Sequence, residues 1–251
     1  GTATDGSTAM GPARFIFVTE GGQILGWAPN VNTGTAFLAV DNSAGGGTGH
    51  AIYKGAALSG DGTSHLLYAA DFHNGRIDVF DGNFQAVALA AGAFADPSLP
   101  PGFAPFGIQA INGDIYVTYA MQDQNAEDDV AGTGLGFVDV FDPKGTLVKR
   151  LIQGGVLNAP WGLALAPASF GPFGSALLVG NFGDGSINAF SPITGELLGT
   201  LSDASGMPIR IEGLWAIQFG NGLLGQETNA LFASAGPADE QHGTYSVIKA
   251  Q

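Results

Sequence analysis

The sequence contains no cysteine and few positive charges. Eight Lys and Arg residues stand against 22 Asp and Glu residues, so the formal net charge is −14. Without cysteine there are no disulfides, no thiol nucleophile and no thiolate ligands for zinc or iron–sulfur clusters. A chain this acidic, with no basic patch, is repelled by polyanions, so we expect neither nucleic acid nor anionic membranes among its partners.

Long apolar runs are missing as well. The longest weakly polar stretch, residues 84–95, is shorter than the roughly 20 residues of a membrane span. The N-terminus lacks the charged-then-apolar pattern of a signal peptide, so we expect that any such peptide is already absent from this chain. Few lysines and many Gly, Ala, Thr and Asn residues are typical of exported proteins and predict a secreted or extracellular location.

Glycine, in contrast, is abundant, with 41 of 251 residues, and it marks a repeat. One short phrase, a turn glycine followed by an alternating strand, occurs five times. The copies are residues 22–27, 75–80, 136–141, 185–190 and 243–248. Their glycines lie 49 to 61 residues apart, which is the size of a four-stranded propeller blade.

A second glycine precedes four of these phrases by 20 to 30 residues and opens another apolar strand. These glycines are Gly55, Gly107, Gly162 and Gly213. Small residues suit the innermost strand of a blade, because the blades converge there. We therefore interpret these segments as inner strands and the first set of phrases as the third strand of each blade.

The pattern predicts one all-β domain over residues 1–251, a β-propeller of four-stranded antiparallel blades. The repeats are expected near residues 52–95, 104–153, 159–203 and 211–251, after a partial first repeat at 1–41. A complete blade is expected at residues 160–201. Because residues 1–13 offer no inner strand and the last repeat stops after its third strand, about five repeats are visible and we expect six blades in a complete ring.

Several phrases resemble a family of secreted bacterial propellers related to NHL-repeat proteins. The resemblance rests on Pro-Trp-Gly-Leu-Ala at 160–164, the turns at 71–75 and 181–185, and Ala-Gly-Pro-Ala-Asp-Glu at 235–240. It covers essentially the whole chain. It implies export and six blades, with a first blade missing here, but it implies no reaction.

Ligands of propellers usually bind on the face where the loops into the inner strands meet the turns between the second and third strands. On that face we expect five candidate ligand-binding residues: Lys54, Phe106, Trp161, Asn181 and Asp184. Glu20, Asp239 and Glu240 share the face. Aromatic side chains there can stack on sugars or flat ligands, although packing between blades also explains them.

Three candidate catalytic residues are Glu212, Asp71 and His73. Asp71 and Asn181 lie in turns of similar sequence, which local side-chain bonds to the backbone also explain. No zinc-binding histidine spacing and no nucleophile elbow occur.

No cofactor is evident, but calcium is a possible ligand. Glu212 precedes a glycine as the calcium ligands of propeller lactonases do, whereas Lys54, Phe106 and Trp161 at the matching places make a poor cage. Asp123, Asp128 and Asp129 belong to an acidic insertion at residues 122–129 that lacks the residue order of a calcium loop. A solvated acidic loop is the alternative.

Three functions follow from these observations. The first is an exported binding scaffold, with no assignable reaction, that presents its loop face to a protein, glycan or small molecule. The second is a metal-assisted hydrolase or lyase that uses Glu212, Asp71 and Asn181 in the central channel. The third is a subunit of an extracellular assembly whose open blades pair with a missing segment or another chain.

Overall fold

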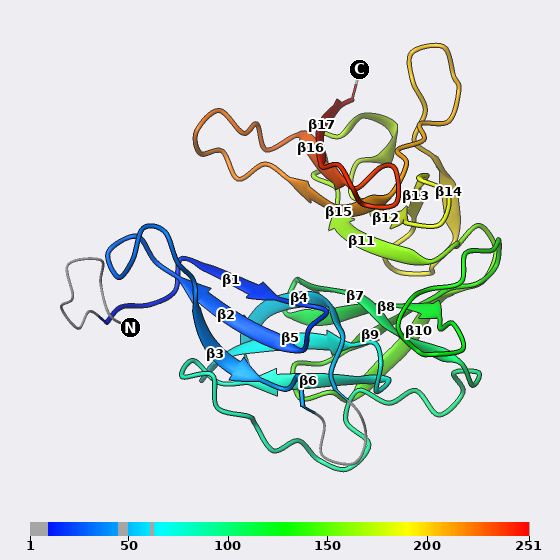
Figure 1. The fold of residues 1–251 in the computed structure, drawn as a ribbon. Helices are drawn as coiled ribbons and strands as arrows, with labels where there is room; N and C mark the ends of the chain where they lie inside the picture. The colour runs from blue at the N-terminus through cyan, green and yellow to red at the C-terminus, as the bar shows by residue number, and fades with distance from the viewer. Residues whose placement is uncertain (1–9, 45–49, 61–62, 251) are drawn as a thin grey trace.

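The computed structural model describes residues 10–44, 50–60 and 63–250 and contains five antiparallel sheets. Within these residues the single helix is the short 3-10 helix η1, Gly171–Phe173. The sheets follow one another along the chain as the blades of a β-propeller (Figure 1). The predicted all-β propeller fold is therefore confirmed.

Each sheet is formed by strands that are consecutive in sequence. The first blade has β1 (Phe15–Val18), β2 (Gln23–Trp27) and β3 (Phe37–Asp41), and the second has β4 (Tyr53–Gly60), β5 (His65–Asp71) and β6 (Arg76–Phe80). The third has β7 (Phe103–Ile111), β8 (Asp114–Met121), β9 (Phe137–Phe141) and β10 (Leu147–Gln153). The fourth has β11 (Pro160–Leu165), β12 (Leu177–Asn181), β13 (Ile187–Phe190) and β14 (Leu197–Thr200), and the fifth has β15 (Leu214–Phe219), β16 (Ala230–Ala235) and β17 (Thr244–Lys249).

Two blades contain four named strands, and one of them, β11–β14, is the blade expected at residues 160–201. The first sheet has no inner strand and the last has no outer strand among the described residues. Each of the five repeated phrases coincides with the third strand of its blade, namely β2, β6, β9, β13 or β17, within one or two residues at either end.

The inner strands β4, β7, β11 and β15 pack side by side around the axis, and small residues make this possible. A Cβ added to Gly55 would lie 3.0 Å from the Phe106 carbonyl oxygen, and one on Gly162 would lie 2.8 Å from that of Trp215. Gly107 meets the Trp161 carbonyl in the same way. The inner strands of neighbouring blades therefore contact each other through backbone atoms, as the glycines predict.

The last inner strand begins directly after Gly213, as predicted, but the alignment of Gly213 with the glycines of the other inner strands is wrong by three residues. Each inner strand has a bulge at one place, between Pro160 and Leu163 in β11 and between Leu214 and Ile217 in β15. This register places Trp215 and Ala216 where the fourth blade has Trp161 and Gly162. Gly213 instead adopts a positive φ of 63° in the turn before β15, against the backbone of Gly236.

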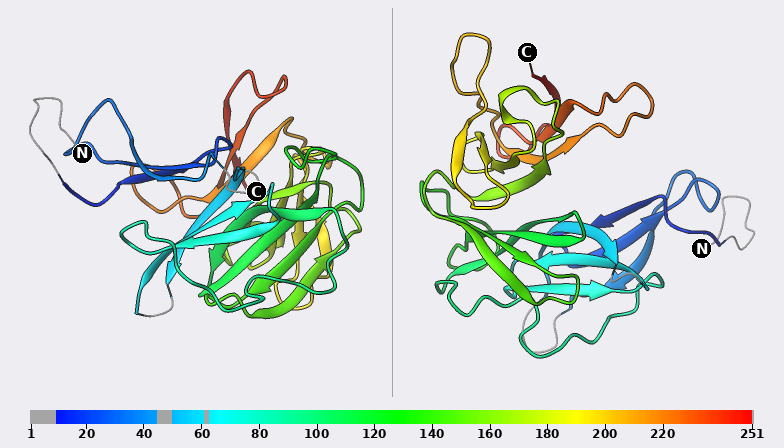
Figure 2. Two further views of the ribbon diagram at one scale, coloured as in Figure 1. Left: turned by 60° about the horizontal axis from the view of Figure 1, so that its bottom comes forward. Right: turned by 180° about the vertical axis from the view of Figure 1, so that it is seen from behind.

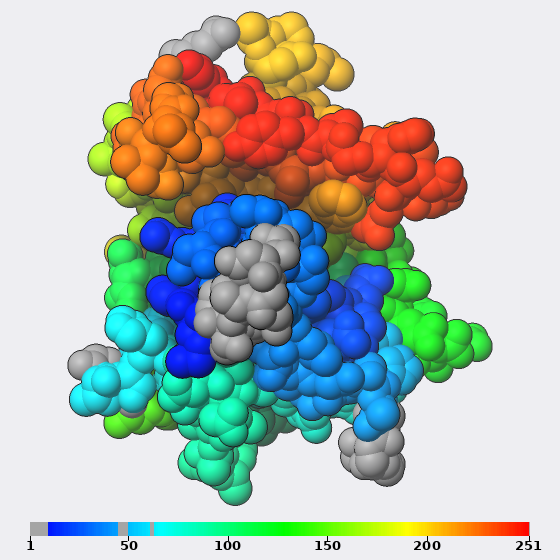
Figure 3. Space-filling view, turned by 60° about the vertical axis from the view of Figure 1, so that its left-hand side comes forward, coloured from blue at the N-terminus to red at the C-terminus, as the bar shows by residue number. Residues whose placement is uncertain are grey.

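Buried apolar clusters fill the spaces between successive sheets. The outward faces of the first and last sheets differ from these buried faces, because they carry exposed aromatic and aliphatic side chains: Phe15 and Phe17 on β1, and Tyr245 and Val247 on β17. Figures 2 and 3 show the first sheet (blue) and the last (orange to red) on the same side of the molecule. No strand pairing joins these two sheets within the described part of the chain.

Candidate functional site

The site begins with a cavity of about 220 Å³ on the axis, between the inner strands of the last four blades. Its walls are mostly small or aliphatic, with polar or aromatic groups at both ends. The lining residues include Lys54, Gln109, Trp161, Trp215 and Gln218. The amides of Gln109 and Gln218 hydrogen-bond each other at 3.2 Å, so β7 and β15 are joined across the axis.

Lys54 is a buried cation at the mouth of this cavity. Its Nζ lies 2.5 Å from Glu20 Oε1 and 3.0 Å from Asp128 Oδ1. Burial opposes protonation, but the hydrogen bonds to the two carboxylates outweigh it and hold the lysine pKa above its usual value. Lys54 therefore ties the β1–β2 turn and the acidic insertion to the channel.

The acidic insertion is folded onto the mouth. Asp123 accepts backbone N–H bonds from Glu127 and Asn125, which lowers the pKa of this carboxyl. His73 Nδ1 lies 3.0 Å from the Ala126 carbonyl oxygen. This contact and the Lys54–Asp128 pair tether the insertion, while the Asp128 side chain is 76% exposed, in keeping with a solvated acidic loop.

Asp129 is half-buried, unlike the exposed Glu127 and Asp128 that precede it. Desolvation raises the pKa of its carboxyl to about 6, although the nearby Lys54 charge acts in the opposite direction. Glu240 adds negative charge from the turn after β16, where its Oε1 accepts the indole N–H of Trp215 at 2.6 Å. The mouth thus combines one paired lysine with several carboxylates and two tryptophans.

Aromatic rings continue from the mouth into the space between the blades. Phe106 is 2% exposed and packs against Phe72, Trp161 and Phe182, with ring centroids 5.0 to 6.2 Å apart. Phe106 is consequently a packing residue. Trp161 belongs to the same cluster but also lines the cavity.

Asp71 and Asn181 are fully buried structural links. Asp71 accepts the backbone N–H of Ile52 at 3.2 Å. Asn181 accepts that of Asn158 at 3.1 Å and donates to the Val156 carbonyl at 2.8 Å. Each side chain ties the end of a second strand to the loop that enters the inner strand, so neither reaches the cavity.

The remaining catalytic and ligand candidates are separate from one another. Asp184 pairs with Arg210 at 2.5 Å. The His73 ring stacks on His50 at 4.9 Å. Exposed Glu212 accepts the Ala238 N–H at 3.1 Å and does not line the cavity. The structure therefore does not bring Glu212, Asp71 and Asn181 together in the channel.

The metal candidates are also dispersed. No group of three His, Asp or Glu side chains able to hold a metal ion occurs among residues 10–44, 50–60 and 63–250. Glu212 stands at the fifth blade, Asp128 pairs with Lys54, and Asp123 caps its own loop. Calcium binding stays a prediction without a preformed cluster to support it.

Sequence reasoning missed Gln109 and Gln218 as lining residues. Trp215 was visible as an aromatic before a small residue, in the pattern of Trp161-Gly162. The two glutamines follow the inner-strand bulges, and nothing in the sequence locates those bulges.

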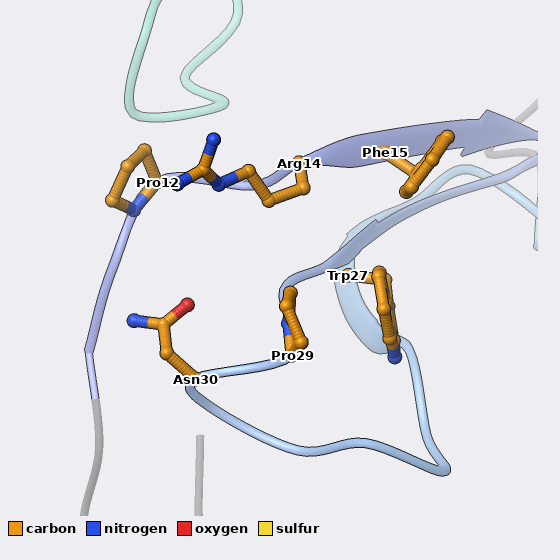
Figure 4. A pocket seen from close by; sticks show the side chains of 6 residues that line it. All are labelled: Pro12, Arg14, Phe15, Trp27, Pro29 and Asn30. Carbon is orange, nitrogen blue, oxygen red and sulfur yellow. The ribbon is translucent and has the colours of Figure 1, made fainter. Parts of the chain in front are cut away.

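A second pocket lies on the first blade. It has a volume of about 420 Å³ and is lined by Pro12, Arg14, Phe15, Trp27, Pro29 and Asn30 (Figure 4). The rings of Phe15 and Trp27 stand side by side with centroids 5.7 Å apart. This pocket is part of the exposed apolar face of the first sheet.

The structure resembles solved β-propellers. A gluconolactonase from Xanthomonas campestris aligns with 93% of this chain and 71% of its own, at a TM-score of 0.58 and 20% identity. An α-L-arabinanase from Penicillium chrysogenum complexed with arabinobiose aligns with 90% of this chain and 66% of its own, at 0.57 and 13%. These likenesses establish the propeller class and nothing finer.

Curated relatives come from a virus. Uncharacterized proteins R640 and R648 of Acanthamoeba polyphaga mimivirus are 36% and 35% identical over 82% and 84% of this chain. The chain spans only 38% and 52% of their lengths. No family model matches. The relatives give no support to the expected bacterial origin.

No helix in the described residues is long and apolar enough to cross a membrane.

Proposed function

We propose that this protein is a non-catalytic binding propeller that takes a neutral carbohydrate at the mouth of its central channel. The observation that carries the proposal is the cavity of about 220 Å³ lined by Trp161, Trp215, Gln109 and Gln218. Aromatic rings offer flat apolar surface to the C–H faces of a sugar ring. Amides supply both donors and acceptors for hydroxyl groups.

The charge at the mouth favours a neutral ligand over an anion. Lys54 is already neutralised by Glu20 and Asp128, and the chain as a whole carries −14. An acidic sugar would have to displace one of these carboxylates and approach the others, which costs Coulomb energy. The predicted glycan or small-molecule partner is narrowed in this way to an uncharged saccharide.

The test is titration calorimetry with glucose, galactose, arabinose and arabinobiose, with glucuronate as the charged comparison. We expect saturable binding of at least one neutral sugar and weaker binding of glucuronate. Gln218→Ala should weaken binding by about tenfold, the loss of roughly one hydrogen bond's free energy. Gln85→Ala, on an exposed loop outside the cavity, is the matched control and should have no effect.

Two outcomes would overturn the proposal: no saturable binding of any neutral sugar, or binding that Gln218→Ala leaves unchanged. Consumption of the sugar during the titration would overturn its non-catalytic part.

Metal-assisted hydrolysis is the second candidate. It is supported by the raised pKa of the Asp129 carboxyl, which interacts with the charge of the lining residue Lys54, since a group that titrates near neutral pH can exchange protons with a substrate. Assays of sugar lactones and aryl glycosides, with calcium and with EDTA, test it. Turnover that Asp129→Asn abolishes would establish this candidate, and absence of turnover would remove it.

A further inference from the structure

The two tryptophans at the mouth of the channel occupy matching places but are held in different ways. Trp161 is the second residue of β11 and Trp215 is the second residue of β15. In the fourth blade, Phe182 begins the turn after β12 and packs on the Trp161 indole, with ring centroids 5.8 Å apart. In the fifth blade, Gly236 begins the turn after β16 at the same place. A glycine supplies no ring to cover Trp215, so this indole needs another support.

The backbone of the turn provides part of that support. A Cβ at Gly236 would overlap Cζ2 of the Trp215 ring, so the indole lies directly against the glycine. The Gly236 N–H donates to the Gly213 carbonyl oxygen at 2.9 Å, which ties the turn to the start of β15. Any larger residue at position 236 would therefore displace the indole.

Glu240 provides the rest of the support from the far end of the same turn. Its Oε1 accepts the Trp215 indole N–H at 2.6 Å. The indole nitrogen is a donor only, so this one bond satisfies it. Hydrogen bonds to a carboxylate are stronger than those between neutral groups. The orientation of Trp215 thus depends on one acidic side chain, whereas Trp161 is held by the rings of Phe106 and Phe182.

The turn that carries Glu240 has an unusual backbone. Ala238, Asp239 and Glu240 follow one another with positive φ angles of 56°, 51° and 61°. L residues rarely adopt this conformation, and each one costs conformational energy. Glu212 holds the strained turn by accepting the Ala238 N–H at 3.1 Å. Because strained segments concentrate at functional sites, this turn has the form expected of a device that places Glu240.

We propose that Glu240 is a positioning residue that holds the Trp215 indole in the orientation in which its ring receives a sugar at the mouth of the channel. This inference rests on the proposed carbohydrate binding and adds a residue that does not itself line the cavity. A tryptophan without such a bond has several rotamers open to it, and restricting them on binding lowers affinity. Glu240 restricts them before the ligand arrives.

The first test observes the hydrogen bond without any ligand, through the indole N–H signals in ¹H–¹⁵N NMR spectra. The chain has three tryptophans, and Trp215→Phe identifies the signal of Trp215 by its loss. Glu240→Ala should shift this signal alone and speed its exchange with solvent. Glu240→Gln should largely preserve it, because the glutamine carbonyl oxygen also accepts an N–H. An unmoved Trp215 signal in Glu240→Ala would overturn the proposal.

The second test is titration calorimetry with glucose, galactose, arabinose and arabinobiose. For a sugar that the unchanged protein binds, Glu240→Ala should weaken binding roughly three- to tenfold, the effect of having to order one large side chain. Glu240→Gln should restore most of the affinity. Glu227→Ala is the matched control, because it removes an exposed carboxylate of the same blade that pairs with Lys249 outside the cavity. It should change neither the affinity nor the Trp215 signal.

A double-variant cycle separates positioning from direct contact between Glu240 and the sugar. Trp215→Phe keeps an aromatic ring but has no N–H, so adding Glu240→Ala to it should have no further effect. An undiminished loss in this background would show that Glu240 acts on the sugar itself and would overturn the proposal. Equal affinity of Glu240→Ala and the unchanged protein, or equal losses in Glu240→Ala and Glu240→Gln, would also overturn it.

The two proposals fail in different ways. Absence of saturable sugar binding by the unchanged protein would overturn the carbohydrate proposal and this inference with it. Sugar binding that does not respond to Glu240 in the expected way would overturn the role of Glu240 alone.

Discussion

The third and fourth blades share one topology but fasten their outer strands in different ways. In the third, fully buried Asp139 faces Arg150, which also pairs with Asp96. In the fourth, Asn188 bonds Thr200 at 2.7 Å and Ser186 at 3.2 Å. In the fourth blade the side chains of Asn188, Thr200 and Ser186 are thus hydrogen-bonded to one another. In the third, both Asp139 carboxylate oxygens and the Tyr119 hydroxyl have no hydrogen bond among the described residues.

The difference shows that one structural position accepts either a charged or a neutral pair, at unequal electrostatic cost. Desolvation, and then the charge of Asp96, raise the pKa of the Asp139 carboxyl to about 7. The fourth blade has the neutral Asn188 at this position. Stability that varies with pH near neutrality should therefore arise from the third blade.

The largest expected effect comes from Asn188→Asp, which gives the fourth blade the acid of the third without its arginine. A buried carboxylate with no cation should cost roughly 3 kcal/mol or more at pH 8. Because burial raises the folded-state pKa of this acid, the loss should fade as pH falls toward the unfolded value near 4. Urea unfolding at pH 4 and pH 8 measures both.

The double variant Asn188→Asp with Thr200→Arg is its control, since it rebuilds the pair of the third blade and should recover part of the loss. Equal stability of Asn188→Asp and the unchanged protein at pH 8 would contradict the comparison.

A smaller and opposite effect is expected for Asp139→Asn, which gives the third blade the neutral side chain of the fourth. A carboxyl whose folded pKa is raised contributes stability that is fully present below about pH 4 and is lost as pH rises through about 7. The variant should therefore gain on the order of 2 kcal/mol at pH 8 and nothing at low pH. Thermal melts across pH 4 to 9 would show a flattened profile, and an unchanged slope would refute the assignment.

The smallest effect should follow Thr200→Val, which keeps the shape of the fourth blade's outer strand and removes one hydrogen bond. Asn188 keeps the bond that its Nδ2 donates to Ser186, and only its Oδ1 loses a donor, so the loss should be about 1 kcal/mol. It should not vary between pH 5 and pH 9, because no titrating group is involved. A clear pH dependence in chemical unfolding would show that the neutral pair is coupled to charges elsewhere.

The sequence was sufficient to predict the propeller, because turn glycines and alternating strands are local signals. Gly55, Gly107 and Gly162 also located the inner strands. Gly213 located the inner strand of the fifth blade as well, since β15 begins at Leu214. Its alignment with Gly162 failed, because the residue in the matching register is Ala216, which has alanine in place of glycine.

The candidate site was harder to predict, because its members come from distant segments. Lys54 and Asp128 are 74 residues apart, and only closure of the blades brings them together. Asp71 and Asn181 were easier to interpret, because the turns that contain them are visible in the sequence. Their side-chain hydrogen bonds to backbone account for their structural role.

The close packing of the inner strands also makes the width of the channel independent of its ligand preference. Where Gly55, Gly107 and Gly162 touch the backbone of the next blade, no larger residue fits. Substitution at these positions therefore cannot change the width of the channel. The lining residues just before Gly55, Gly162 and Ala216, namely Lys54, Trp161 and Trp215, already differ in charge and shape. In a propeller of this kind, substitutions at the mouth of the channel can change ligand preference, whereas a wider channel requires another blade.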